Sequence, residues 1–91
     1  MRILLVEDDV MLAEAIARAL TQSAHTVDSA RSGDEADRAL LANKYDLVLL
    51  DIGLPQIDGF EVVRRLRHRR SSVPVLMMTV REALEDRVAG R

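Results

Sequence analysis

Three short, continuously apolar runs, at residues 3–6, 47–50 and 75–78, limit most strongly what this chain can fold into. Each run has the length of a strand, and continuous rather than alternating apolarity is typical of parallel strands that are covered on both faces. Residues 25–30 alternate weakly and predict one more strand. Stretches with apolar residues at helical spacing lie between these runs. Strands that alternate with helices predict an α/β fold with a parallel sheet.

The first helical stretch follows the first strand directly. It covers residues 10–23, and Asp9 is the expected N-cap because its short acidic side chain can accept a backbone hydrogen bond there. Glu14, Arg18 and Gln22 are expected on the solvent side. The apolar stripe expected to face the core consists of Leu12, Ala15, Ile16, Ala19 and Leu20.

Three further helices complete a βαβαβαβα order. Ser32 followed by Glu35 predicts a capping box at the start of the second helix, and Asp58 with Glu61 predicts another at the start of the third. The expected buried face of the third helix consists of Phe60, Val63 and Leu66. Residues 81–90 predict the last helix, after the fourth strand.

The composition limits the classes of function. A length of 91 residues predicts one domain, and the formal charge of −2 with mixed signs offers no basic surface for nucleic acid. The absence of cysteine excludes disulfides and thiolate metal sites. No apolar stretch approaches the ~20 residues that span a bilayer, and the apolar start is too short for a signal peptide. We therefore expect a cytoplasmic domain without membrane contact and without direct nucleic-acid contact.

Acidic residues follow the first and third strands. Because the carboxyl ends of parallel strands meet at one edge of a sheet, we expect Glu7, Asp8 and Asp51 to lie close together. Clustered like charges cost free energy unless a cation neutralises them, and carboxylate oxygens suit Mg²⁺ or Mn²⁺. Acids after a strand are also common helix caps, which is the role expected of Asp9. Together the other three acids predict a cation site.

A reactive carboxylate is the second expectation at this edge. An Asp can attack phosphorus and form an aspartyl phosphate, and a metal would keep Asp51 ionised for that step. Thr79, at the end of the adjacent fourth strand, can donate a hydroxyl hydrogen bond to a phosphoryl oxygen. A single Thr at a strand end is more often structural, so this role depends on its neighbours.

Three segments carry a resemblance to a known family. LVEDD at residues 5–9, LLDIGLP at 49–55 with Asp58-Gly59 following, and VPVLMMT at 73–79 resemble bacterial two-component response-regulator receiver domains. The resemblance spans the chain and implies a flavodoxin-like, doubly wound parallel sheet with strand order 2-1-3-4 here. Residues 82–90 resemble the fourth helix of receivers fused to winged-helix DNA-binding domains, so the parent is expected to regulate transcription through a separate domain.

The resemblance also implies roles for individual residues. Asp51 becomes the phosphoacceptor, Glu7 and Asp8 the acidic metal ligands, the carbonyl of Gly53 a backbone metal ligand, and Thr79 the switch hydroxyl. The implied cofactor is Mg²⁺ or Mn²⁺, and the implied partner is a sensor histidine kinase. A signalling module is expected rather than an enzyme. A phosphotransferase or phosphatase with an Asp nucleophile would ordinarily need a second acid shortly after Asp51, where Gly53 stands.

The sequence departs from the family pattern at its end. The family's fifth strand, which ends in Lys-Pro, and its fifth helix do not precede Arg91, and the only lysine is Lys44. We therefore expect residues 1–91 to be a C-terminally incomplete receiver that self-associates at the side left open. A phosphorylation-impaired receiver that acts only in protein interaction or dimerisation is the alternative.

Overall fold

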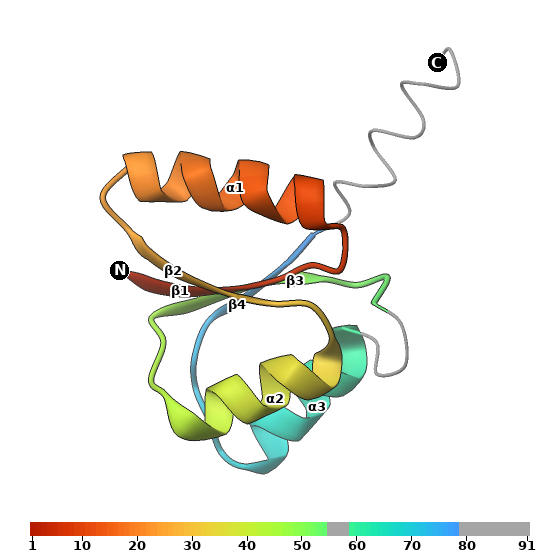
Figure 1. Ribbon diagram of the computed structural model, residues 1–91. Helices are drawn as coiled ribbons and strands as arrows, with labels where there is room; N and C mark the ends of the chain where they lie inside the picture. Colours follow the sequence, from red (N-terminus) through yellow and green to blue (C-terminus); the bar gives the residue numbers. More distant parts are fainter. Residues whose placement is uncertain (55–58, 79–91) are drawn as a thin grey trace.

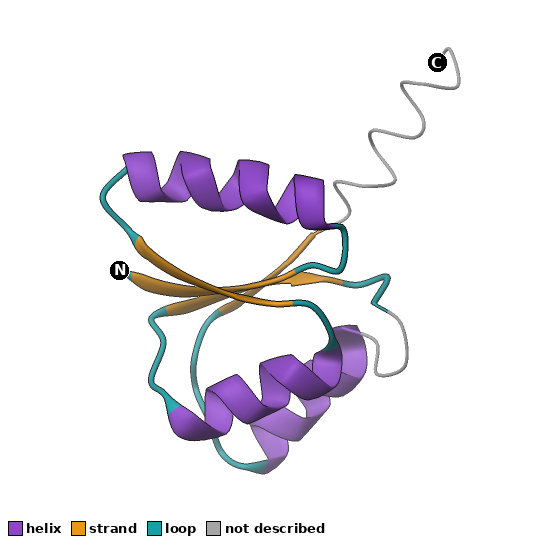
Figure 2. Ribbon diagram, viewed as in Figure 1, coloured by secondary structure: helices purple, strands orange, loops and turns teal. Residues whose placement is uncertain are grey.

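A four-stranded parallel sheet lies between two layers of helices (Figure 1). The computed structural model describes residues 1–54 and 59–78. Helix α1 covers one face of the sheet, and helices α2 and α3 cover the other (Figure 2). The elements follow in the order β1 (Arg2–Val6), α1 (Val10–Gln22), β2 (Thr26–Ala30), α2 (Gly33–Ala42), β3 (Leu47–Asp51), α3 (Gly59–His68) and β4 (Val75–Met78).

The strand order is β2-β1-β3-β4, and all three pairings are parallel, which confirms the predicted order and the doubly wound α/β fold. The central strands β1 and β3 are buried over nearly their whole length, as continuous apolar runs require. Val6 pairs with Leu50, so β1 and β3 end at the same level of the sheet. The acids that follow them therefore begin at one edge.

The hydrophobic core consists of two clusters, one on each face of the sheet. The cluster under α2 and α3 has as its buried members Leu4, Val6, Ala30, Ala36, Val48, Leu50, Leu54 and Val62. The cluster under α1 has as its buried members Ile3, Leu5, Ala13 and Leu49. Among the described residues no helix is long and apolar enough to cross a membrane.

Helix α1 begins as predicted but buries a different stripe. The Asp9 carboxylate accepts a hydrogen bond from the Leu12 backbone N–H at 3.0 Å, which confirms the N-cap. The predicted inward positions Ala15 and Ala19 are wrong, because both side chains are exposed. Alanines stand on both flanks of this helix, so its apolar spacing fits two stripes. The side chains that pack toward the core are Ala13, Ile16, Ala17 and Leu20.

Helix α2 begins with the predicted cap. The Ser32 hydroxyl oxygen accepts a hydrogen bond from the Glu35 backbone N–H at 3.1 Å. The Glu35 carboxylate reaches back to the backbone N–H of Arg31 at 3.2 Å, one residue before the cap. The first contact satisfies an N–H of the first turn, which has no intrahelical partner, and the second fixes the residue before the cap.

Helix α3 turns a different face to the sheet than predicted. Val62 and Leu66 are buried, Val63 is half-buried, and Phe60 is 64% exposed, so the prediction that Phe60 belongs to the buried face is wrong. Gly59 is buried at the start of the helix, and it fixes the inward face at positions 59, 62 and 66. The predicted cap Asp58, Thr79 and the predicted helix 81–90 lie outside the described residues.

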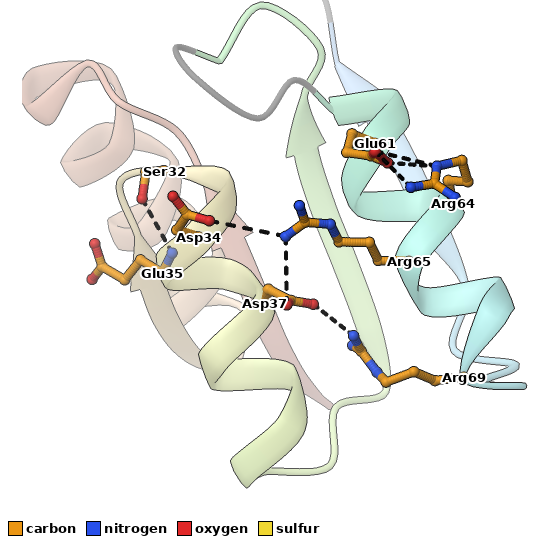
Figure 3. A network of polar contacts seen from close by, with 8 residues as sticks. All are labelled: Ser32, Asp34, Glu35, Asp37, Glu61, Arg64, Arg65 and Arg69. Atoms are coloured by element: carbon orange, nitrogen blue, oxygen red, sulfur yellow. Dashed lines mark hydrogen bonds and ion pairs between the residues drawn. The ribbon is translucent and has the colours of Figure 1, made fainter.

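Ion pairs join α2 to α3 on the outer surface (Figure 3). Arg69 contacts Asp37 at 2.6 Å, and Arg65 lies 3.8 Å from Asp37 and 3.9 Å from Asp34. Partly exposed pairs of this kind each contribute about 0–1 kcal/mol, so they fix the alignment of the two helices more than they stabilise the fold. Two arginines near the C-terminal end of α3, Arg65 and Arg69, therefore have acidic partners on α2.

Candidate functional site

The structure brings together the three acids that were predicted to form a site. Glu7, Asp8 and Asp51 each offer a carboxylate oxygen, and these oxygens all lie within 4.8 Å of one another. Glu7 and Asp51 are buried, with 2% and 5% of their surface exposed, and Asp8 is half-buried. The cluster lies at the carboxyl edge of the sheet, where β1 and β3 end.

Asp51 is positioned by the end of β3 and the turn that follows it. It is the final residue of β3, and its Cα pairs with that of Met78 on β4. The backbone then turns, and the N–H of Gly53 donates a hydrogen bond to Asp51 Oδ1 at 3.0 Å. This bond fixes the orientation of the carboxylate.

Glu7 and Asp8 are placed by the end of β1. The backbone N–H of Glu7 donates to the carbonyl of Ala30 at 3.0 Å, which continues the contact between β1 and β2. The N–H of Asp8 donates to Glu7 Oε2 at 2.9 Å. Consecutive residues that both reach the site need this local turn, since neighbouring side chains in a strand point to opposite faces.

Gly59 packs against the peptide that follows Asp51, and this role was not predicted from the sequence. A Cβ at position 59 would lie 2.9 Å from the Cα of Ile52, 3.1 Å from the Asp51 carbonyl oxygen and 3.2 Å from Met77 Cε. Only glycine allows α3 to pack this closely against the peptide that follows Asp51. The signal in the sequence was a glycine at the start of a predicted helix.

The donor set determines what the cluster can hold. Three carboxylates are hard oxygen ligands of the type that Mg²⁺ and Mn²⁺ prefer, and magnesium commonly uses one or two carboxylates with water. Three acids this close repel one another strongly unless a cation lies between them. The residues present therefore fit a divalent cation. The Gly53 carbonyl remains a predicted ligand, and Thr79 lies outside the described residues.

Comparison with known proteins agrees with this geometry. The family of the response regulator receiver domain matches residues 3–91. The chain is 52% identical over 89 residues to the transcriptional regulatory protein TcrA of Mycobacterium tuberculosis, covering 98% of this chain and 35% of TcrA. It is 44% identical over 90 residues to the response regulator protein PmrA of Pseudomonas aeruginosa, covering 99% of this chain and 41% of PmrA. The chain thus spans about two fifths or less of these relatives.

Solved structures show the same fold. The N-terminal domain of a response regulator receiver protein from Methanoculleus marisnigri JR1 superposes with a TM-score of 0.83 at 36% identity, over 86% of this chain and 65% of that one. The response regulator protein TrrA from Thermotoga maritima, in complex with Mg²⁺-BeF, superposes with a TM-score of 0.74 at 33% identity, over 84% of this chain and 64% of that one.

Proposed function

The chain belongs to the family of response regulator receiver domains, and we propose that Asp51 is its phosphoacceptor. The observation that carries the proposal is the clustering of Glu7, Asp8 and Asp51 within 4.8 Å at the carboxyl edge of the sheet. A buried carboxylate in a group of acids is poorly explained by stability alone. It is well explained by a cation site with a nucleophile.

The proposed reaction is transfer of a phosphoryl group to the Asp51 side chain. A carboxylate oxygen of Asp51 forms the new bond to phosphorus while the bond from phosphorus to the donor breaks, and the donor atom keeps that electron pair. The Gly53 N–H holds the carboxylate in place through Oδ1. The hydroxyl of Thr79 is proposed to donate a hydrogen bond to a phosphoryl oxygen in the product.

A divalent cation is part of the proposal. Glu7, Asp8, Asp51 and the Gly53 carbonyl would hold Mg²⁺ or Mn²⁺, which would neutralise charge on the carboxylates and on the incoming phosphoryl group. The Mg²⁺ in the similar TrrA structure supports this assignment.

The experiment is phosphorylation of the chain with acetyl phosphate in the presence of Mg²⁺, followed by intact-mass analysis. One phosphoryl group per chain is expected, lost on hydroxylamine treatment as an acyl phosphate should be. Asp51→Asn should abolish the product, whereas Asp34→Asn, an exposed Asp on α2, should retain it. Labelling of Asp51→Asn to the wild-type extent, or no labelling of the wild type with Mg²⁺ present, would refute the proposal.

The wider role follows from the relatives. The family match and the names of TcrA, a transcriptional regulatory protein, and PmrA, a response regulator protein, support a place in a two-component phosphorelay. The cytoplasm is the proposed location, and a sensor histidine kinase is the proposed phosphoryl donor. Because the chain covers only part of those proteins, control of transcription is proposed for the whole protein, through a separate DNA-binding domain.

Self-association without phosphorylation is the second candidate. One observation favours it: Leu76 on β4 is 58% exposed, and β4 lies at one edge of the sheet among the described residues. An exposed apolar edge strand can pair with another chain. Sedimentation velocity should then show a dimer that Leu76→Lys dissociates. A wild-type monomer at high protein concentration would exclude this candidate.

A further inference from the structure

A cavity of about 550 Å³ lies at the amino end of β3 and β4, at the opposite edge of the sheet from the acids. Its walls come from two connections, residues 43–46 between α2 and β3 and residues 70–74 between α3 and β4. We propose that this cavity binds a small molecule that carries one oxyanion group, a phosphate or a carboxylate, on a compact apolar body. Its volume falls within the range of about 300–1,000 Å³ typical of small-molecule sites.

The charge of the lining favours an anion. Lys44 and Arg70 are both exposed residues of the lining, and Asp46 is the only acid among the described residues that line it. The Asp46 carboxylate already accepts a hydrogen bond from the Arg2 backbone N–H at 2.7 Å. Arg67 adds a third cation, since its guanidinium lies against the same loop. The cations therefore outnumber the one acid.

The helix ends reduce this excess without removing it. α2 and α3 both end beside the cavity, and each helix C-terminus carries roughly half a negative charge. Those two ends and Asp46 together amount to about two negative charges, against two positive charges from the lining residues Lys44 and Arg70. Arg67 is not part of the lining, but it binds the Ser71 carbonyl of the lining loop and adds a third positive charge nearby. A balance of about one positive charge suits a single oxyanion.

One wall is held rigid by Arg67. Its Nη1 donates to the carbonyl oxygens of Ser71 at 2.8 Å and Val73 at 3.0 Å, so one side chain ties down three residues of loop. Ser71 and Ser72 line the cavity on this loop, and a serine hydroxyl can donate to an oxyanion while also accepting a bond. A wall fixed before binding lowers the ordering cost of the ligand site.

Arg70 stands where glycine would be the stable choice. Its φ is +63°, in the left-handed region, and the N–H of Ser71 reaches back to the Leu66 carbonyl at 3.1 Å, which is the usual ending of a helix with glycine at this position. A left-handed conformation costs a side-chain-bearing residue free energy that glycine avoids. The cavity therefore has an arginine, Arg70, at a position where the backbone conformation favours glycine.

The other wall supplies apolar surface for the body of the ligand. Tyr45 is fixed by a hydrogen bond from its hydroxyl to Asp28 Oδ2 at 2.8 Å and by the Arg2 guanidinium 5.0 Å from its ring centre. Leu40 and Pro74 continue this surface. A ligand with charge at one end and a small apolar body would match both parts of the cavity.

The test is a titration followed by amide chemical shifts in ¹H–¹⁵N NMR, with divalent cations removed. The probes are phenyl phosphate and benzoate, which distinguish the two oxyanions, inorganic phosphate as the anion without a body, and benzylammonium as the matched cation. Saturable shifts for an aromatic anion are expected at residues 43–46 and 70–73. Arg70→Gly and Lys44→Met should each weaken the binding at least about fivefold, as loss of a charge-assisted contact does.

A matched control separates binding from folding. Arg70→Gly and Ala24→Gly both place glycine at a left-handed position, φ +63° and +68°, so both should fold at least as stably as the wild type. Of these two glycine variants, only Arg70→Gly should bind the aromatic anions more weakly. Unchanged affinity in Arg70→Gly and Lys44→Met, equal saturation by benzylammonium, or no saturable shift at these residues with either aromatic anion would each overturn the proposal.

Discussion

Replacing Asp51 by Asn should make the metal-free protein more stable, although it removes the residue proposed to carry the function. The buried carboxylates of Glu7 and Asp51 and the half-buried one of Asp8 lie together, with oxygens within 4.8 Å of one another. Asn keeps the shape of Asp, and its oxygen can still accept the hydrogen bond from the Gly53 N–H. The substitution therefore removes charge and little else.

The magnitude follows from the separation of the oxygens. Two ionised carboxylate oxygens 4.8 Å apart repel by about 3.5 kcal/mol at an effective dielectric constant of about 20. Asp51 has two such neighbours, but the acids relieve part of the repulsion by moving apart. A net gain of about 1–2 kcal/mol is expected, which raises the Tm of a chain of this size by roughly 4–16 °C.

The assay is urea unfolding followed by circular dichroism, first with EDTA and then with Mg²⁺. Mg²⁺ at ten times its dissociation constant should stabilise the wild type by about 1.4 kcal/mol and Asp51→Asn much less. Asp34→Asn serves as the control and should change stability by no more than about 0.5 kcal/mol under either condition. An Asp51→Asn protein that is less stable than the wild type in EDTA, yet stabilised equally by Mg²⁺, would refute the electrostatic reasoning.

Three other substitutions test the fold around the two sites. Gly59→Ala should destabilise the protein by about 1–3 kcal/mol in urea unfolding and slow phosphorylation, because the added Cβ would meet the Cα of Ile52 at 2.9 Å; wild-type behaviour would contradict this. Ala24→Gly should raise stability by about 0.5–1 kcal/mol in the same assay, since φ is +68° there. Tyr45→Phe should cost about 1 kcal/mol near neutral pH, because it removes the hydrogen bond that the Tyr45 hydroxyl donates to Asp28 Oδ2. This hydrogen bond and, after it, the one from Arg2 lower the pKa of Asp28. Because the pKa of Asp28 is lowered in the folded protein, this stabilisation is present above the ordinary Asp pKa near 4 and is lost as pH falls through the pKa of the folded state. The difference in stability from the wild type should therefore shrink in acid. A difference that does not change with pH would contradict this prediction.

The strands and caps could be predicted from the sequence because their signals are local. A continuous apolar run defines β1 or β3 without reference to the rest of the chain, and Asp9 and Ser32 cap the helices that directly follow them. The acid cluster was predictable for a related reason. Once the sheet is parallel, the residue after each strand must lie at one edge, so Asp51 and Glu7 follow from topology.

The helix faces were less predictable because their signals are ambiguous. In α1 an alanine is compatible with either the core or solvent, so Ala13 and Ala15 gave no preference before the sheet was in place. Phe60 was assigned to the core on its hydrophobicity, whereas the close approach of Gly59 to the Asp51 peptide turns that side chain outward. A packing contact with the end of β3 decided the rotation of the helix, and the apolar spacing within α3 alone does not encode it.

The parallel topology also explains why the two edges of one sheet carry opposite chemistry. At the carboxyl edge the chain leaves each strand for a helix N-terminus, which favours acids such as Asp9, and the Glu7–Asp51 cluster is built on that preference. At the amino edge the chain arrives from a helix C-terminus, which favours cations such as Arg70 and Lys44. Asp51 lies five residues after Asp46, about 16 Å along the strand, a distance at which two unit charges interact by only about 1 kcal/mol at an effective dielectric constant of about 20. An oxyanion in the cavity at the amino edge would therefore have little direct electrostatic effect on the charge of Asp51, and any coupling between the two sites would have to pass through the backbone of β3.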